Sequence, residues 1–276
     1  MLALTFDDGP DTRWTAAVLD ALAACRARAT FFVLGERVRA HPELVARAVA
    51  EGHAVGVHGD AHLRHPDAGR AAVAADLAAA LAALAAAGVA PGRWRVPWGA
   101  LAPFTAELAA LHGLALTGWT ADTHDWRGDR ADAMLAAVEP GLAPGAVVLC
   151  HDGIGSGARR RDCAETVALV GPLVAAARAR GLEPVALDAA WRAPVPRGNP
   201  AWPDPQGSPE SPGAPAGSPE APGARAVRGA PAGSPEVPGA TASAPAGSPE
   251  VPGARPGRGT PARPDVPSRV SADALG

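Results

Sequence analysis

The stretch LALTFDDGPDTRWTAAVLDALAACRARATFFVL, residues 2–34, contains the pattern that the first part of the chain repeats. It begins with an apolar run over 2–5, turns over 6–10, and predicts a helix over 12–27. A run of β-branched and aromatic residues over 30–34 then predicts a second, buried strand. Because a strand, a helix and a strand in this order are typical of parallel pairing, the opening of the chain predicts an α/β fold.

The same alternation continues to about residue 187. Further strands are expected over 54–57, 93–96, 114–120, 146–150 and 183–187. Further helices are expected over 42–51, 71–87, 104–111, 131–138 and 162–180. Seven strand–helix units of this size predict a parallel sheet closed into a distorted (β/α)7-8 barrel. A doubly wound open sheet is the alternative architecture.

The composition changes near residue 197. Of the 80 residues over 197–276, 31 are Pro or Gly, and the motif Gly-Ser-Pro-Glu-x-Pro-Gly-Ala begins at residues 207, 217, 233 and 247. Such repeats bury too little apolar surface to offset the entropy of the chain. We therefore expect a folded catalytic barrel over 1–196, followed by a disordered Pro/Gly/Ser-rich tail over 197–276.

Charge and hydropathy exclude some partners. The formal net charge is −3, there is no Lys, and no basic stripe marks the predicted barrel, which argues against a nucleic-acid partner. No apolar run is long enough to predict a membrane span. The chain shows no signal peptide, so we expect a cytoplasmic protein as written, and a secreted or cell-envelope protein if the true start lies upstream. No protein partner follows from the sequence.

Polar residues gather where the predicted strands end. They come after five different strands: Asp7 and Asp8; His58 and His62; Arg95; Asp122, Asp125 and Trp126; His151 and Asp152. Because the carboxyl ends of the strands meet at one face of such a barrel, these side chains are expected to form a single site.

The pair His58 and His62 with Asp8 predicts a metal site. Two imidazoles and a carboxylate leave an open position for water on a four-coordinate ion. The pair of histidines alone is equally well explained as a surface feature, but the two carboxylates at another strand end favour ligation. One division of roles makes Asp8 a ligand and Asp7 a free general base. The alternative is an Asp-Gly-Pro turn in which Asp8 or Asp11 caps a helix.

His151 ends an apolar strand and predicts a proton donor. Hydrolysis of an amide needs a proton for the departing amine, and a histidine opposite the base supplies it. A histidine at the rim of the core is the alternative interpretation.

Five segments of the sequence resemble the five motifs of one protein family, and they occur in the same order along the chain. They are Thr5-Phe6-Asp7-Asp8-Gly9-Pro10, His58-Gly59-Asp60-Ala61-His62, Arg95-Val96-Pro97-Trp98-Gly99, Asp122-Thr123-His124-Asp125-Trp126 and Leu149-Cys150-His151-Asp152. The chain is similar in these segments to the polysaccharide deacetylases, the NodB-type domains of carbohydrate esterase family 4. One residue departs from the second motif, where Gly59 replaces a Ser or Thr, and this predicts a looser metal loop.

The resemblance implies a distorted barrel and a role for each site residue. Asp7 is the base, oriented by Arg95, and His151 is the acid, tuned by Asp125. Asp8, His58 and His62 bind one divalent metal, with zinc expected and cobalt, nickel or manganese as alternatives. The backbone N–H of Trp98 helps to hold the oxyanion, and Trp126 and Leu149 form the walls of the acetyl pocket.

The resemblance implies a hydrolase that removes an acetyl group from an N-acetylated sugar, a non-peptide carbon–nitrogen bond. The substrate is peptidoglycan, a chitin-like oligomer or a smaller N-acetylhexosamine compound. Three alternatives remain open: an O-acetyl esterase on a xylan-like polymer, hydrolysis of a cyclic amide or another C–N bond, and a catalytically dead carbohydrate-binding module.

Overall fold

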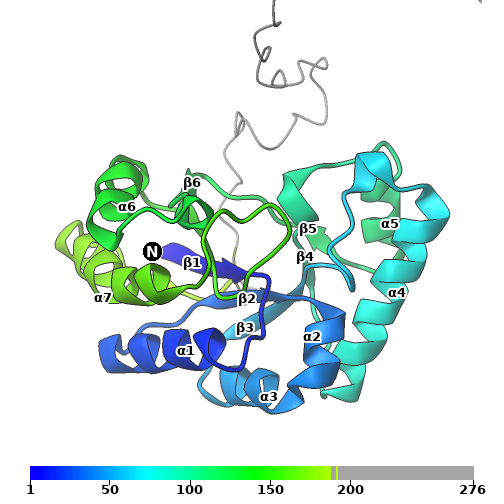
Figure 1. The fold of residues 1–276 in the computed structure, drawn as a ribbon, viewed down its shortest axis with the longest axis horizontal. Coiled ribbons are helices and arrows are strands. Elements are labelled where there is room, and N and C mark those ends of the chain that lie inside the picture. The colour runs from blue at the N-terminus through cyan, green and yellow to red at the C-terminus, as the bar shows by residue number, and fades with distance from the viewer. Residues whose placement is uncertain (188–190, 192–276) are drawn as a thin grey trace, which may run out of the picture. The chain divides into compact units, whose positions relative to one another are not determined.

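A parallel sheet with helices packed around it forms the part of the chain that the computed structural model describes, residues 1–187 and 191 (Figure 1). The predicted tail over 197–276 and its boundary lie outside these residues. The strands are β1 (Leu2–Asp7), β2 (Thr30–Val33), β3 (Ala54–Val57), β4 (Arg93–Trp94), β5 (Ala115–Leu116), β6 (Ala121–Asp122), β7 (Val147–His151) and β8 (Pro184–Val185). The α-helices are α1 (Trp14–Cys25), α2 (Gly35–Ala40), α3 (Pro42–Ala50), α4 (Arg70–Ala86), α5 (Thr105–Leu111), α6 (Ala131–Val138) and α7 (Ala164–Ala179).

The strand order is that of a barrel with one open seam. The sheet runs β5-β4-β3-β2-β1-β7-β6, and every ladder is parallel. On one side of β1 lie β2, β3, β4 and β5 in turn, and on the other side lie β7 and then β6. Strands that follow one another in sequence are thus mostly neighbours, as they are around a barrel. Within the described residues, no ladder joins β5 to β6. The α/β prediction of a distorted barrel is confirmed, and the doubly wound alternative does not fit this order.

The single strand predicted over 114–120 is wrong, because the open seam interrupts it. The segment contains β5 and then a stretch that crosses the seam, and β6 begins just beyond it. The backbone N–H of Thr117 donates to the Trp94 carbonyl in β4, while the N–H of Thr120 donates to the Val147 carbonyl in β7. One apolar run thus pairs with opposite sides of the seam, which hydrophobic periodicity does not reveal.

Helix α2 is not predicted by the sequence pattern. It begins at Gly35, a residue that normally interrupts helices. Here a side chain would not fit, because a Cβ at Gly35 would lie 2.6 Å from the Cα of Ala80 in α4. The glycine lets α2 pack closely on α4, so its role is tertiary rather than local.

Residues of β1 alternate between two apolar clusters. Leu2, Leu4 and Phe6 belong to the main core between the sheet and the helices. Ala3 belongs to a smaller cluster with Phe32, Val147 and Leu187. Because side chains alternate along a strand, Asp7 shares the face of Ala3 rather than that of Phe6. The carboxyl end of the strand therefore places the Asp7 side chain on the face away from the helices.

None of the helices in the described residues has the length and apolar character needed to cross a bilayer.

Candidate metal and acid–base site

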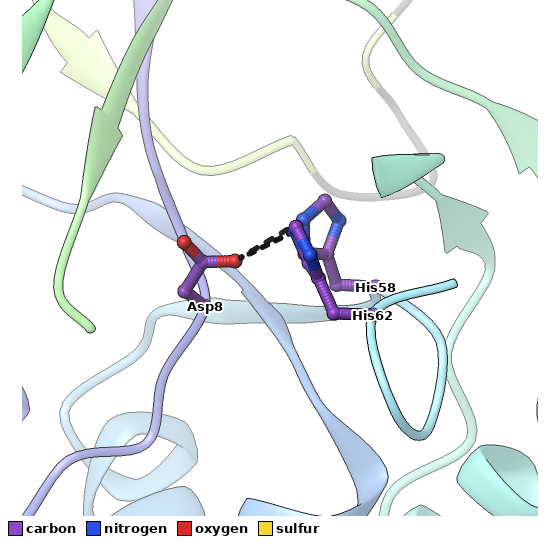
Figure 2. A group of neighbouring side chains, drawn as sticks. All are labelled: Asp8, His58 and His62. Atoms are coloured by element: carbon purple, nitrogen blue, oxygen red, sulfur yellow. Dashed lines mark ion pairs between the residues drawn. The ribbon is translucent and has the colours of Figure 1, made fainter. Parts of the chain in front are cut away.

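Asp8, His58 and His62 converge on one point (Figure 2). Asp8 follows β1 with a φ of 73°, His58 follows β3, and His62 lies in the next loop with a φ of 54°. The Asp8 Oδ1 atom is 3.2 Å from His62 Nε2 and 3.5 Å from His58 Nε2. One ligand atom from each residue lies within 4.8 Å of the others, so the three side chains could hold a metal ion.

The chemistry of the three side chains fits a divalent cation. Asp8 Oδ1 is buried and accepts no hydrogen bond, which leaves a lone pair for a cation. The far nitrogen of each ring has a partner: His58 Nδ1 lies 2.7 Å from the Arg95 carbonyl and His62 Nδ1 lies 3.3 Å from Ser156 Oγ. Both Nε2 atoms therefore point towards Asp8, as ligating histidines require. Burial opposes ionisation of Asp8, but the two imidazoles outweigh it and hold the pKa of Asp8 well below its usual value.

The loop between the two histidines is held by α4. The Asp76 carboxylate accepts the backbone N–H groups of Asp60 and Ala61, both at 2.8 Å. Gly59 has a φ of 93°, and a Cβ there would lie 2.7 Å from Asp76 Oδ2. At Gly59, where the family motif has Ser or Thr, the Asp76 carboxylate occupies the space that a side chain would need.

Arg95 fixes Asp7 from behind. The Arg95 side chain is fully buried, and its Nη1 donates to Asp7 Oδ1 at 2.8 Å and to Thr5 Oγ1 at 2.7 Å. Its guanidinium also lies 4.2 Å from the centre of the Phe32 ring. Oδ2 of Asp7 remains on the side of His58, 3.8 Å from Nε2. One carboxylate oxygen is therefore anchored and the other faces the metal ligands.

His151 stands beside Asp7 in the neighbouring strand. The β1–β7 ladder pairs these two residues directly. His151 Nδ1 lies 2.7 Å from Asp125 Oδ1, so Nε2 is the free nitrogen. Burial of the ring disfavours its charge, but Asp125 and then Asp8 and Asp7 outweigh burial and raise the pKa of His151 to about 9. The His151 ring is therefore a positively charged imidazolium, protonated on both nitrogens, at neutral pH in the metal-free protein.

These groups face a cavity of about 280 Å³. Eight of the ten predicted site residues line it: Asp7, Asp8, His58, His62, Trp98, Trp126, Leu149 and His151. The other two, Arg95 and Asp125, lie behind Asp7 and His151 and contact them directly. The structure thus brings all ten into one place.

Two residues near the motifs lie elsewhere. Trp94, directly before the third motif, is fully buried, since it belongs to β4 and packs in the main core. His65 is also buried; its Nδ1 lies 3.0 Å from Thr105 Oγ1, and burial lowers its pKa to about 4. Neither side chain lines the cavity.

The segment 153–158 after β7 forms a wall of the cavity that the motifs do not predict. We call it the strap. Gly153 and Gly155 lie directly against Asp8, where a side chain would collide with it. Arg37 of α2 donates to the carbonyls of Asp8 and Ile154, both at 2.7 Å, and so ties the strap to β1. Glycine stands at residues 153, 155 and 157, and this alternation is a sequence signal that could have indicated the close approach.

This half-barrel, with a candidate metal triad and a paired aspartate and histidine at its strand ends, points to a hydrolase. The family model of the polysaccharide deacetylases matches residues 1–117. A chitooligosaccharide deacetylase of Bradyrhizobium sp. (strain ANU 289) is 38% identical over 191 residues, 65% of this chain and 85% of that protein. The chain belongs to the polysaccharide deacetylase family.

Two further relatives support the assignment. The peptidoglycan-N-acetylglucosamine deacetylase PgdA of Listeria monocytogenes serotype 1/2a (strain 10403S) is 39% identical over 152 residues, 55% of this chain and 32% of that protein. The structure of a family 4 carbohydrate esterase from Streptomyces lividans in complex with acetate matches with a TM-score of 0.63 and 30% identity, over 70% of this chain and 95% of that one.

Proposed function

We propose that the chain is a metal-dependent N-deacetylase that releases acetate from an N-acetylglucosamine oligosaccharide. Asp8, His58 and His62 hold one divalent cation, and zinc suits two imidazoles and a carboxylate. The observation that carries the proposal is the pairing of Asp7 with His151 across adjacent strands, beside the candidate metal ligands. The relatives named as chitooligosaccharide and peptidoglycan-N-acetylglucosamine deacetylases support the substrate class.

The reaction needs water, a base and an acid. A divalent cation held by Asp8, His58 and His62 would polarise the acetyl carbonyl and make water a better nucleophile. Asp7, held in place by Arg95, takes the proton of the attacking water. His151 gives its proton to the sugar nitrogen as the C–N bond breaks, because an amide anion is a very poor leaving group. The products are acetate and a free amino sugar.

Two further roles belong to the walls of the cavity. Trp126 and Leu149 offer apolar surface for the acetyl methyl group, and both line the cavity with the acid–base pair. The backbone N–H of Trp98 is proposed to stabilise the oxyanion, an interaction that matters most in the transition state. Trp98 itself is 43% exposed, and its ring lies 4.1 Å from that of His62, so it stands at the edge of the metal site.

Acetate release from N-acetylglucosamine oligomers tests the proposal. The protein is stripped of metal and then given zinc or cobalt, with acetylated xylan as the competing substrate. Release that depends on metal and favours the oligomers is expected. Preference for xylan would indicate the O-acetyl esterase instead, and zinc binding with no hydrolysis of either substrate would indicate a different C–N substrate or a binding module.

A further inference from the structure

We propose that Arg160 is a positioning residue that fixes both Asp125 and the backbone of His151. None of the five family-like segments contains it. Arg160 lines the cavity, yet its side chain is only 5% exposed. The inference rests on the proposed function, in which His151 is the acid.

The Asp125 carboxylate is held at both oxygens. Its Oδ2 accepts from Arg160 Nη1 at 2.8 Å, from Thr166 Oγ1 at 2.8 Å and from the backbone N–H of His151 at 2.9 Å. Only Oδ1 remains for His151 Nδ1. The carboxylate therefore cannot rotate without breaking a charge-assisted hydrogen bond, one of the stronger kinds in proteins.

The same guanidinium holds the chain that carries the acid. Its Nη2 donates to the His151 carbonyl at 3.1 Å and to the Gly153 carbonyl at 2.9 Å. One planar group thus fixes the partner of the imidazole and the backbone of the imidazole at once. It also ties down the start of the strap at Gly153, next to Ile154, whose carbonyl Arg37 holds.

The position calls for arginine rather than any cation. The two terminal nitrogens contact four acceptors, of Asp125, Thr166, His151 and Gly153. A lysine ammonium keeps the charge but lacks the planar fork that spans such acceptors. We therefore expect lysine to restore part of the function and an uncharged side chain to restore none.

Four variants separate positioning from general stability: Arg160→Met, Arg160→Lys, Thr166→Val and Arg161→Met. Arg161 is the matched control, an exposed neighbour. The measurements are kcat and KM on an N-acetylglucosamine oligomer with zinc, the zinc dissociation constant, and the low-field NMR signal of the His151 Nδ1 proton in the metal-free protein.

For Arg160→Met, we expect kcat to fall about 10–100-fold, the range for lost outer-shell partners, with KM and zinc affinity nearly unchanged. The His151 proton signal is expected to broaden or move. Arg160→Lys recovers part of kcat, Thr166→Val loses less than Arg160→Met, and Arg161→Met matches the wild type.

The inference would be overturned if the kcat of Arg160→Met stayed within about threefold of wild type, well short of the expected fall of about 10–100-fold. A fall in zinc affinity of Arg160→Met as large as the fall in its kcat would also overturn the inference, because Arg160 would then support the loops in general. If Arg160→Met does not fold, Arg160→Lys and Thr166→Val decide by the same criteria. If the wild type releases no acetate, the proposed function fails, while the proton signal still decides the role of Arg160.

Discussion

Asp7 and Asp8 are adjacent carboxylates with different surroundings. Asp7 belongs to β1 and is paired with Arg95, whereas Asp8 turns away through a positive φ towards the two histidines. Two neighbouring carboxylates in a buried place repel each other unless cations separate them. Arg95 supplies one positive charge, and a metal ion on Asp8 is proposed to supply the other.

Asp7→Asn tests this division of roles. We expect kcat to fall at least about 100-fold, because the base is lost, while zinc still binds. Asp8→Asn is the matched variant and should lose zinc binding along with activity. Kinetics and a zinc-competition titration on both proteins check the prediction. Loss of zinc binding in Asp7→Asn would place Asp7 among the ligands.

His151 predicts a pH dependence with a definite sign. Its pKa in the folded protein is raised to about 9, above the usual 6.5. Protonation of His151 therefore stabilises the metal-free protein below pH 6.5, and that contribution disappears as the pH rises through about 9. Thermal denaturation of the metal-free protein across this window should show stability falling, and His151→Gln should flatten the curve.

Activity should follow the same proton. In the proposed mechanism the protonated form of His151 is the proton donor, so kcat should fall as the pH rises through its pKa. A cation on Asp8 cancels part of the attraction that favours the imidazolium, which moves this limb below the pKa of about 9 in the metal-free protein. A pH–rate profile with zinc measures the limb; an alkaline limb that His151→Gln leaves in place would assign it to another group.

At the scale of elements, α4 supports the metal loop through a single carboxylate. Asp76→Ala removes both acceptors of the Asp60 and Ala61 N–H groups. We expect zinc affinity to fall about 10–100-fold, as it does when an outer-shell partner is lost. Asp67→Ala is the control, since Asp67 is exposed and pairs with Arg64 at the surface. Equal zinc affinities in the two variants would contradict this role.

The elements themselves were largely predictable, because most are local. Periodicity places helix 131–138 and strand 54–57 as the structure has them. It misses α2 because Gly35 is required by α4, which lies far along the chain. It joins β5 to the crossing segment because the seam exists only in three dimensions. Local pattern predicts elements, and packing decides where they are interrupted.

The site was predictable wherever a residue acts through its own side chain at a strand end. Asp8 and His58 directly follow strands, and His62 lies four residues further on, so the pattern alone brings the three together. Arg37 and Asp76 hold backbone atoms of other segments, and Arg160 holds Asp125 together with two carbonyls at the end of β7 and just after it. In the sequence, polar residues at those places look like ordinary surface. Their roles appear only when the hydrogen bonds are seen.

At the scale of the whole molecule, we propose that residues 1–196 fold and act as one catalytic domain. Leu187 and Trp191 pack with the inner cluster of the sheet, so the fold needs the chain at least that far. A chain ending at Pro196 should keep the kcat and melting temperature of the full chain. A chain ending at Leu182 lacks β8 and Leu187 and should unfold at lower temperature. Loss of activity in the longer truncation would move the boundary.

The place of β1 also determines the order in which the protein can be completed during synthesis. β1 pairs with β2, about 25 residues later, but also with β7 and β8, which follow more than 130 residues later. Such long-range pairing slows folding, since a large loop must close first. While the ribosome is still making the middle of the chain, one edge of β1 lacks its partner and can pair wrongly. The first strand to be made is therefore among the last to be finished, and His151 reaches Asp7 only when the barrel is nearly whole.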